Sequence, residues 1–341
     1  VNVGLLSAPY AFAKSGSLSL AVLPIVCLLM FSAAEKVKVC LKRLDSVVRY
    51  PLAPLEKDFS LMAYVCFGEI GRSIISTVFV VELTSAMLTY FIMIENSVVA
   101  TIPTWNNLGV LVASGIFSFF LLFVPMDWLA SFQVLSAIAV LVVMAALFIS
   151  VYLSTPHLGD VLIECLFSSE AWQSSMATPA VFAHLWSSFS LFVYAYGNIP
   201  CLPAILVSMK NPKDQNKALG WGFISSLLCY GAVSIIGFAG YGALLNPSFI
   251  VNISTDPEGN PIPHLHYLQS IACFAFSLKL QLSLPLLATP VLLVLEHALK
   301  MRNSKAIFRI LLRAAFVCFM CVVAYFCADE LAALAGLFGA C

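Results

Sequence analysis

Long apolar runs, separated by short polar or glycine- and proline-rich stretches, dominate the sequence. The runs cover approximately residues 1–13, 17–34, 68–94, 107–124, 128–152, 182–206, 218–242, 267–295 and 307–327, and a further one starts at 331. About 20 consecutive apolar residues in a helix cross the roughly 30 Å hydrocarbon core of a bilayer. The 341 residues therefore predict an all-α polytopic membrane protein with about ten spans.

The composition excludes several classes of protein. Apolar residues make up 61% of the chain and charged residues 10%, against roughly 45–50% and about 25% in ordinary soluble domains. So few charges cannot form a solvated surface, which excludes a cytosolic enzyme and a disordered protein. Because 17 basic residues balance 17 acidic ones, we also expect no nucleic-acid partner. The lipid bilayer is the expected surrounding, and protein partners stay unknown.

The basic residues gather on one side of the expected spans. Fourteen of the 17 lie in segments 35–58, 207–217 and 296–313. Loops 95–106, 153–181, 243–266 and 328–330, on the other side, contain no Lys or Arg. By the positive-inside rule the basic side is cytosolic.

Smaller features add three expectations. The chain begins at Val1 and ends at Cys341 within apolar stretches, so we interpret it as a fragment trimmed at both ends. Without a cluster of His and Cys, we expect no metal site and no catalytic residues. The tripeptide Asn252-Ile253-Ser254 lies on the non-cytosolic side, where it could be glycosylated.

Two apolar runs contain residues that disturb a helix. The first run reads GLLSAPYAF at 4–12, with Gly4 and Pro9 on either side of Leu5 to Ala8. The sixth run reads YAYGNIPCLP at 194–203. Backbone groups freed by such breaks cannot face lipid, so they must line a protein cavity or bind something. Ordinary proline kinks are the alternative. Breaks in spans one and six are nevertheless typical of inverted-repeat transporters with a site at the bilayer midplane.

Four segments resemble the amino acid/auxin permease family. GLLSAPYAF at 4–12 resembles its first helix, and YAYGNIPCLPAILVSMKNPKDQNKAL at 194–219 resembles its sixth helix with the following loop. LKLQLSLPLLATPVLLVLE at 278–296 and GYGALLNPSFIVNIS at 240–254 are most similar to the vesicular inhibitory amino acid and plant vacuolar branch.

The resemblance implies a LeuT-like fold of five plus five inverted helices in a single transmembrane domain, 1–341. The first repeat would cover about 1–152 and the second about 182–341. It also implies transport of amino acids coupled to protons or sodium. In the eighth helix, Ala288-Thr289-Pro290 stands where many sodium-coupled members have a phenylalanine before the second proline, which favours protons.

A zwitterionic amino acid needs partners for its carboxylate and its ammonium group away from bulk water. Amide groups at the first break could donate to the carboxylate, and carbonyls at the second could accept from the ammonium. Tyrosines before the second break could contribute packing or a hydroxyl, although only one of this i, i+2 pair should face the cavity. The candidate binding residues are Gly4, Leu5, Leu6, Ser7, Tyr194, Tyr196, Gly197 and Asn198.

Four residues are candidates for ion coupling: Asn2, Ser283, Lys279 and Glu82. The hydroxyl of Ser283 could join an oxygen shell for a cation, or bond the carbonyl four residues earlier. Glu82 and Lys279 lie near the middle of their spans, where an isolated charge is costly. We therefore expect them to pair, with either a coupling or a purely structural role.

The favoured interpretation is a secondary active transporter of small neutral amino acids that works by alternating access, coupled to protons. Sodium symport is the alternative within this class, and an amino acid-sensing receptor on the same fold is the alternative outside it. A channel is disfavoured, because the site expected at two broken helices is closed. No cofactor is expected beyond the coupling ion. The membrane would be vacuolar, vesicular or the plasma membrane.

Overall fold

The computed structural model describes residues 4–47, 58–102, 104–124, 126–155, 158–167, 181–197, 199–209, 211–246, 249–256, 259–260, 262–299 and 306–328. Within these ranges the chain is helical. The α-helices are α1 (Gly4–Ser15), α2 (Ser19–Val47), α3 (Phe59–Thr101), α4 (Asn107–Leu121), α5 (Met126–Ser154), α6 (Leu158–Phe167), α8 (Val181–Ala195), α9 (Leu202–Ser208), α10 (Gln215–Tyr241), α11 (His266–Ala298) and α12 (Ala306–Phe326). The 3-10 turns are η1 (Gly16–Leu18), η3 (Ile199–Cys201), η4 (Pro212–Asp214), η5 (Gly242–Leu244), η6 (Phe249–Ser254) and η7 (Pro263–Leu265).

Among the described residues, seven helical segments are long and apolar enough to cross a membrane. They agree with the predicted runs, with two differences. Runs 1–13 and 17–34 correspond to α1 and α2, which η1 separates at Gly16, where φ is 58°, and the 12 residues of α1 are shorter than a typical span. Run 107–124 becomes α4, whose 15 residues are shorter than a typical span. The run from 331 lies outside the described residues. The chain is therefore a polytopic helical membrane protein, but the described part does not contain ten separate spans.

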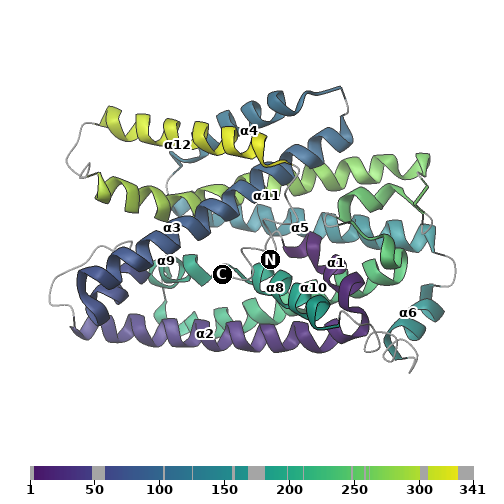
Figure 1. The fold of residues 1–341 in the computed structure, drawn as a ribbon, viewed down its shortest axis with the longest axis horizontal. Helices are drawn as coiled ribbons and strands as arrows, with labels where there is room; N and C mark the ends of the chain where they lie inside the picture. The colour runs from purple at the N-terminus through teal and green to yellow at the C-terminus, as the bar shows by residue number, and fades with distance from the viewer. Residues whose placement is uncertain are drawn as a thin grey trace.

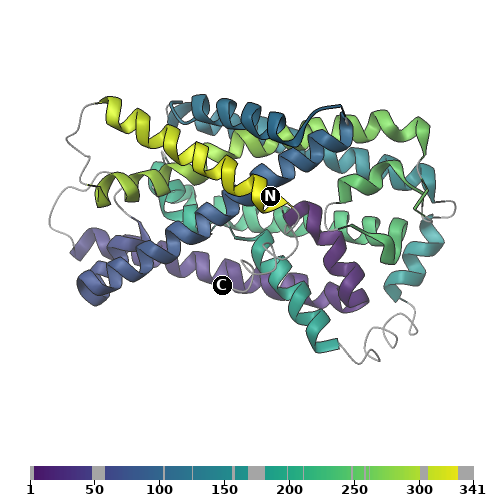
Figure 2. The same cartoon turned by 45° about the horizontal axis from the view of Figure 1, so that its top comes forward.

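Most helices run along the long axis of the molecule (Figure 1). The helices α12 and α4 lie together along one side, α2 lies along the other, and α3 crosses between them, as both views show (Figures 1 and 2). Helix α11 packs on α3 and α5, whereas α1 packs on α8 and α10. Large apolar side chains on the outer faces are exposed, for example Phe67 and Leu228, as expected for surfaces that contact lipid.

Helix α3 changes direction at Gly68, where φ is 66° and ψ is −157°. This backbone conformation is accessible to glycine and rarely to other residues. The predicted span 68–94 begins at this kink, so the nine residues from Phe59 form a separate helical stretch in front of the span.

The non-cytosolic segment between α10 and α11 is folded onto the helices. Asn252 is buried there, and its Nδ2 donates to the carbonyl of Leu244 at 3.1 Å while its Oδ1 accepts from the N–H of Asn246 at 3.0 Å. Both ends of the amide are therefore used inside the fold. The glycosylation hypothesis for this asparagine is wrong for the folded protein.

Candidate functional site

The membrane-length segment Val181–Val207 is interrupted near its middle. Helix α8 ends at Ala195, Tyr196 and Gly197 form a turn, and η3 leads into α9. Proline explains the break, because Pro200 has no N–H for the carbonyl of Tyr196 and its ring would clash with that carbonyl in a continuous helix. Pro203 acts in the same way on Ile199. The predicted site residue Asn198 lies outside the described residues.

The last carbonyls of α8 are satisfied locally. The N–H of Tyr196 donates to the carbonyls of Phe192 and Val193, both at 3.1 Å, and the N–H of Gly197 donates to that of Tyr194 at 3.0 Å. The carbonyl of Ala195 accepts from the hydroxyl of Tyr230 on α10, at 2.8 Å. Tyr230 thus fixes the end of α8 from a neighbouring helix.

The turn leaves no room for a side chain at Gly197. A Cβ at this position would lie 2.9 Å from the carbonyl oxygen of Tyr194, closer than carbon atoms normally approach oxygen. A side chain here would therefore force the turn open.

The first turn of α1 packs directly on the end of α8. A Cβ added to Gly4 would lie 2.1 Å from the Cβ of Ala195 and 2.3 Å from its Cα, so the two backbones approach as closely as glycine permits. Further along, the hydroxyl of Ser188 donates to the carbonyl of Ala11 at 2.8 Å. The structure therefore brings the two predicted halves of the substrate site together.

The expected irregular backbone between Gly4 and Pro9 is absent, and that prediction is wrong. Residues Gly4 to Ser15 form one α-helix with Pro9 inside it. A single proline removes one hydrogen bond, from the carbonyl of Leu5, and packing of α1 on two helices keeps the rest in place. Leu5, Leu6 and Ser7 are buried in this helix, and Asn2 lies outside the described residues.

Among the side chains of the first described turn of α1, Ser7 is the polar one. The hydroxyl of Ser7 points back to the carbonyl of Gly4 at 3.4 Å.

Aromatic side chains surround the break. The ring of Tyr196 stacks on Phe223 with centroids 5.8 Å apart and meets the edge of Tyr230 at 5.2 Å. Tyr194 is buried as well. The hydroxyls of Tyr194 and Tyr196 are buried without a hydrogen bond to the described residues. Such groups are costly to leave unsatisfied, so they are candidates to contact a polar ligand.

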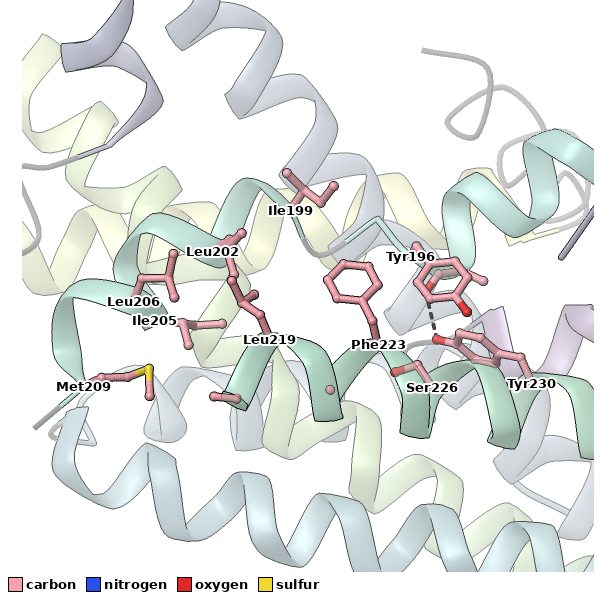
Figure 3. A pocket seen from close by; sticks show the side chains of 13 residues that line it. Tyr196, Ile199, Leu202, Ile205, Leu206, Met209, Leu219, Phe223, Ser226 and Tyr230 are labelled. Carbon is pink, nitrogen blue, oxygen red and sulfur yellow. Dashed lines mark hydrogen bonds between the residues drawn. The ribbon is translucent and has the colours of Figure 1, made fainter. Parts of the chain in front are cut away.

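A cavity of about 240 Å³ adjoins the break (Figure 3). We call it the α9–α10 crevice, since those helices form its walls, with Ile205 and Met209 on one side and Gly222 and Phe223 on the other. Its inner end is at Tyr196, and its other end lies toward the basic loop that joins α9 to α10. Of the tyrosine pair, Tyr196 lines this crevice and Tyr194 does not.

Lys279 lies deep inside the protein. It is 2% exposed, and its Nζ lies 5.2 Å from the centre of the Tyr90 ring on α3. The aromatic ring of Tyr90 is itself fully buried, so the lysine and this ring lie together in the interior.

The predicted Glu82–Lys279 pair is wrong for the described residues, among which no ion pair joins the two side chains. Lys279 lies at the level of Tyr90, and Glu82 is eight residues earlier on α3, roughly 12 Å along the helix. Glu82 is only partly buried. The position of each residue within its apolar run predicted that both lie near the middle of a span. It could not predict that the two helices are shifted along each other.

Ser283 uses its hydroxyl within the protein. The hydroxyl donates to the carbonyl of Lys279 at 2.9 Å and lies 3.4 Å from the hydroxyl of Ser136 on α5. This is the backbone alternative considered from the sequence. Tyr230, Tyr90 and Ser136 were not foreseen as neighbours of the site, since only the packing between helices brings them to their partners.

Comparison with known proteins agrees with this architecture. The model of a family described as transmembrane amino acid transporter protein matches residues 1–341. Among curated proteins of Arabidopsis thaliana, amino acid transporter AVT1J is 26% identical over 263 residues, which are 75% of this chain and 57% of the relative. For amino acid transporters AVT1B and AVT1D the identity is also 26%, over 82% and 89% of this chain and 51% and 52% of the relatives.

The chain spans about half the length of these curated relatives. The family match extends from the first helix through the broken sixth span to the last residue, so it confirms the resemblance seen at 4–12, 194–219 and 278–296. The chain belongs to the family of transmembrane amino acid transporter proteins.

Proposed function

We propose that the protein is a secondary active transporter of small neutral amino acids, that it works by alternating access, and that it is coupled to protons. A vacuolar or vesicular membrane is the proposed location. The three relatives described above are amino acid transporters, which supports the substrate class. Two inverted repeats, about 1–152 and 182–341, are the architecture proposed for the whole.

The contact between Gly4 and Ala195 is the observation that carries the proposal. This contact puts the first described turn of α1 beside the interrupted end of α8. Backbone N–H groups of the first helix are the proposed partners of the amino acid carboxylate. The backbone after Ala195 and the free hydroxyls of Tyr194 and Tyr196 suit its ammonium group.

Proton coupling is proposed to involve Lys279. A charged ammonium at this depth is costly, and a contact with one aromatic ring contributes only about 0.5–2 kcal/mol. Reversible loss of its proton would remove that cost. Glu82, partly buried within the membrane-length part of α3, is the second proposed titrating group. Sodium is less well supported, because the Ser283 hydroxyl is already bonded to its own helix.

The test is uptake of labelled neutral amino acids by the full-length protein in proteoliposomes, with proton and sodium gradients imposed separately. We expect saturable uptake that follows the proton gradient. Dependence on the sodium gradient alone would favour sodium symport. Saturable binding without flux would contradict transport and favour a receptor.

A matched pair of lysine variants tests the coupling residue. Lys14 lies 5.1 Å from the ring centre of Tyr10, much as Lys279 lies over Tyr90, but Lys14 is exposed. We expect Lys279→Met to abolish the dependence of uptake on the proton gradient and Lys14→Met to leave it unchanged. Unaltered coupling in Lys279→Met would exclude the lysine from the coupling step.

A further inference from the structure

The walls of the α9–α10 crevice are apolar. On α10 they include Ala218, Gly222 and Ser226, small residues spaced four apart that form a shallow strip, and on α9 they include Leu202, Ile205 and Leu206. The Tyr230 hydroxyl at the inner end is already committed to the carbonyl of Ala195. A zwitterion would find few partners along these walls, whereas a hydrocarbon chain would find many.

The crevice opens on a surface that faces lipid. Ile205 on its wall is 38% exposed, and the adjoining outer face of α10 exposes Trp221, Ile224 and Leu228 by 71%, 49% and 66%. Both walls belong to membrane-length segments, Val181–Val207 and Pro212–Tyr241. A hydrocarbon chain could therefore enter sideways from the bilayer.

Positive charge lies at the end of the crevice away from the break. Lys217 directly precedes the lining residue Ala218, and Lys213 lies one turn earlier in η4. Both lysines are exposed. Beside them Lys38 of α2 is held by Glu35 and by Asn216, at 2.7 Å from the Asn216 Oδ1, which ties α2 to the start of α10. The exposed pair can reach a phosphate group at the membrane surface.

We propose that the α9–α10 crevice binds an anionic phospholipid from the leaflet on the side of the basic loops. One acyl chain lies between α9 and α10 with its end near Tyr196, and the headgroup contacts Lys213 and Lys217. The chain would pack against the same Tyr196 and Phe223 rings that border the broken helix. The lipid is thereby placed to influence the break, and its binding can be measured whether or not the proposed transport function is correct.

The test is photo-labelling of the full-length protein in vesicles of phosphatidylcholine containing phosphatidylserine with a diazirine at the end of one acyl chain. Peptide mass spectrometry then locates the adducts. We expect labels concentrated on the crevice-lining parts of α9 and α10, and severalfold weaker labelling there when the diazirine is carried by phosphatidylcholine. Labels spread evenly over all exposed helices, or none in the crevice, would overturn the proposal.

Two glycines on α10 provide a matched pair of variants. Neither Gly222 nor Gly220 has a neighbour within 4 Å of an added Cβ, but only Gly222 lines the crevice. We expect Gly222→Leu to reduce crevice labelling severalfold and Gly220→Leu to leave it unchanged. Ser226→Leu, with Ser225→Leu as its control, repeats the comparison if a glycine variant does not fold. Equal labelling in both members of both pairs would show that the crevice is not the site.

Charge is tested separately with Lys213→Gln combined with Lys217→Gln. We expect this variant to lose the preference for phosphatidylserine while labelling by phosphatidylcholine persists. If the variant still prefers phosphatidylserine, the two lysines do not bind the headgroup. Protection of the crevice by a saturating neutral amino acid would place the amino acid itself there, and the lipid assignment would then be wrong.

Discussion

Helix α1 and the α8–α9 segment lie side by side and each contains proline, yet their backbones differ. Helix α1 continues through Pro9, whereas the α8–α9 segment leaves the helical path between Ala195 and Leu202. Helix α11 resembles α1 in this respect, because it contains Pro285 and Pro290 and remains continuous.

The difference shows that the density of helix-disturbing residues matters more than the presence of one. Pro9 deprives one carbonyl of its donor, and the prolines of α11 are five residues apart. In the α8–α9 segment Gly197, Pro200 and Pro203 fall within seven residues. The α-helix ends before Pro200 and restarts at Leu202, so that Pro203 lies in the first turn of α9, where a proline is tolerated.

The largest effect is expected from removing the break. Each proline disfavours an interior helical position by about 3 kcal/mol relative to alanine, so Pro200→Ala combined with Pro203→Ala should let the helix run through. We expect uptake in proteoliposomes to fall by at least about tenfold, since 1.4 kcal/mol already corresponds to tenfold. Hydrogen exchange of a peptide covering 194–203 should become slower.

The matched control is Pro285→Ala with Pro290→Ala in α11, which is already continuous. Its backbone exchange should change little. If the α8–α9 variant gains protected amides and yet transports normally, the break is not needed for transport.

A smaller effect is expected at the contact between the two segments. Gly4→Leu would place a Cβ on the Cβ and Cα of Ala195, and backbone atoms cannot move aside as a flexible side chain can. Overpacking of this kind typically costs about 1–3 kcal/mol. We expect a lower thermal unfolding temperature and a severalfold loss of uptake. Gly109→Leu, with open space around its Cβ, should behave like the parent protein, and equal behaviour of both variants would contradict the close approach.

The next largest effect is expected from removing the Tyr230 hydroxyl, which donates to the last carbonyl of α8. Tyr230→Phe leaves the carbonyl of Ala195 without its partner, and an unsatisfied buried group costs about 1–3 kcal/mol. We expect a moderate loss of thermal stability and of uptake. Tyr267, which is 61% exposed, provides the control as Tyr267→Phe. An unchanged Tyr230→Phe protein would mean that the carbonyl finds another donor.

Features of the fold that depend on neighbouring residues in the sequence could be predicted, whereas features that depend on contacts between helices could not. Apolar runs predicted where the helices lie, including the start of the third span at the Gly68 kink, because crossing a bilayer is a local requirement on length and polarity. They did not predict the polar ends, since α2 continues to Val47 and α3 to Thr101. The break at Gly197 was predictable for the same reason, since its causes are adjacent in sequence.

The rest depends on packing between helices. The sequence predicted Gly4 as a site of unwinding, but it could not show that α8 and α10 hold α1 helical. It placed Glu82 and Lys279 at similar depth without the offset between α3 and α11. Tyr230 and Tyr90 were missed because an isolated tyrosine in an apolar run has no local pattern that names its partner.

The smallest effect is expected from replacing Pro9. This variant also tests most directly whether α1 and the α8–α9 segment differ in function as they differ in backbone. Alanine there would supply an N–H to the carbonyl of Leu5, in a helix that is already regular. The gain is opposed by lost packing, since Pro9 Cβ and Cγ are the atoms nearest to a Cβ added at Gly237 of α10, at 2.9 and 3.1 Å. We therefore expect Pro9→Ala to change uptake severalfold less than the double variant at Pro200 and Pro203, and to leave the unfolding temperature nearly unchanged. If it instead abolishes uptake as that double variant does, α1 must unwind during the transport cycle, and the two segments would differ only in the state described here.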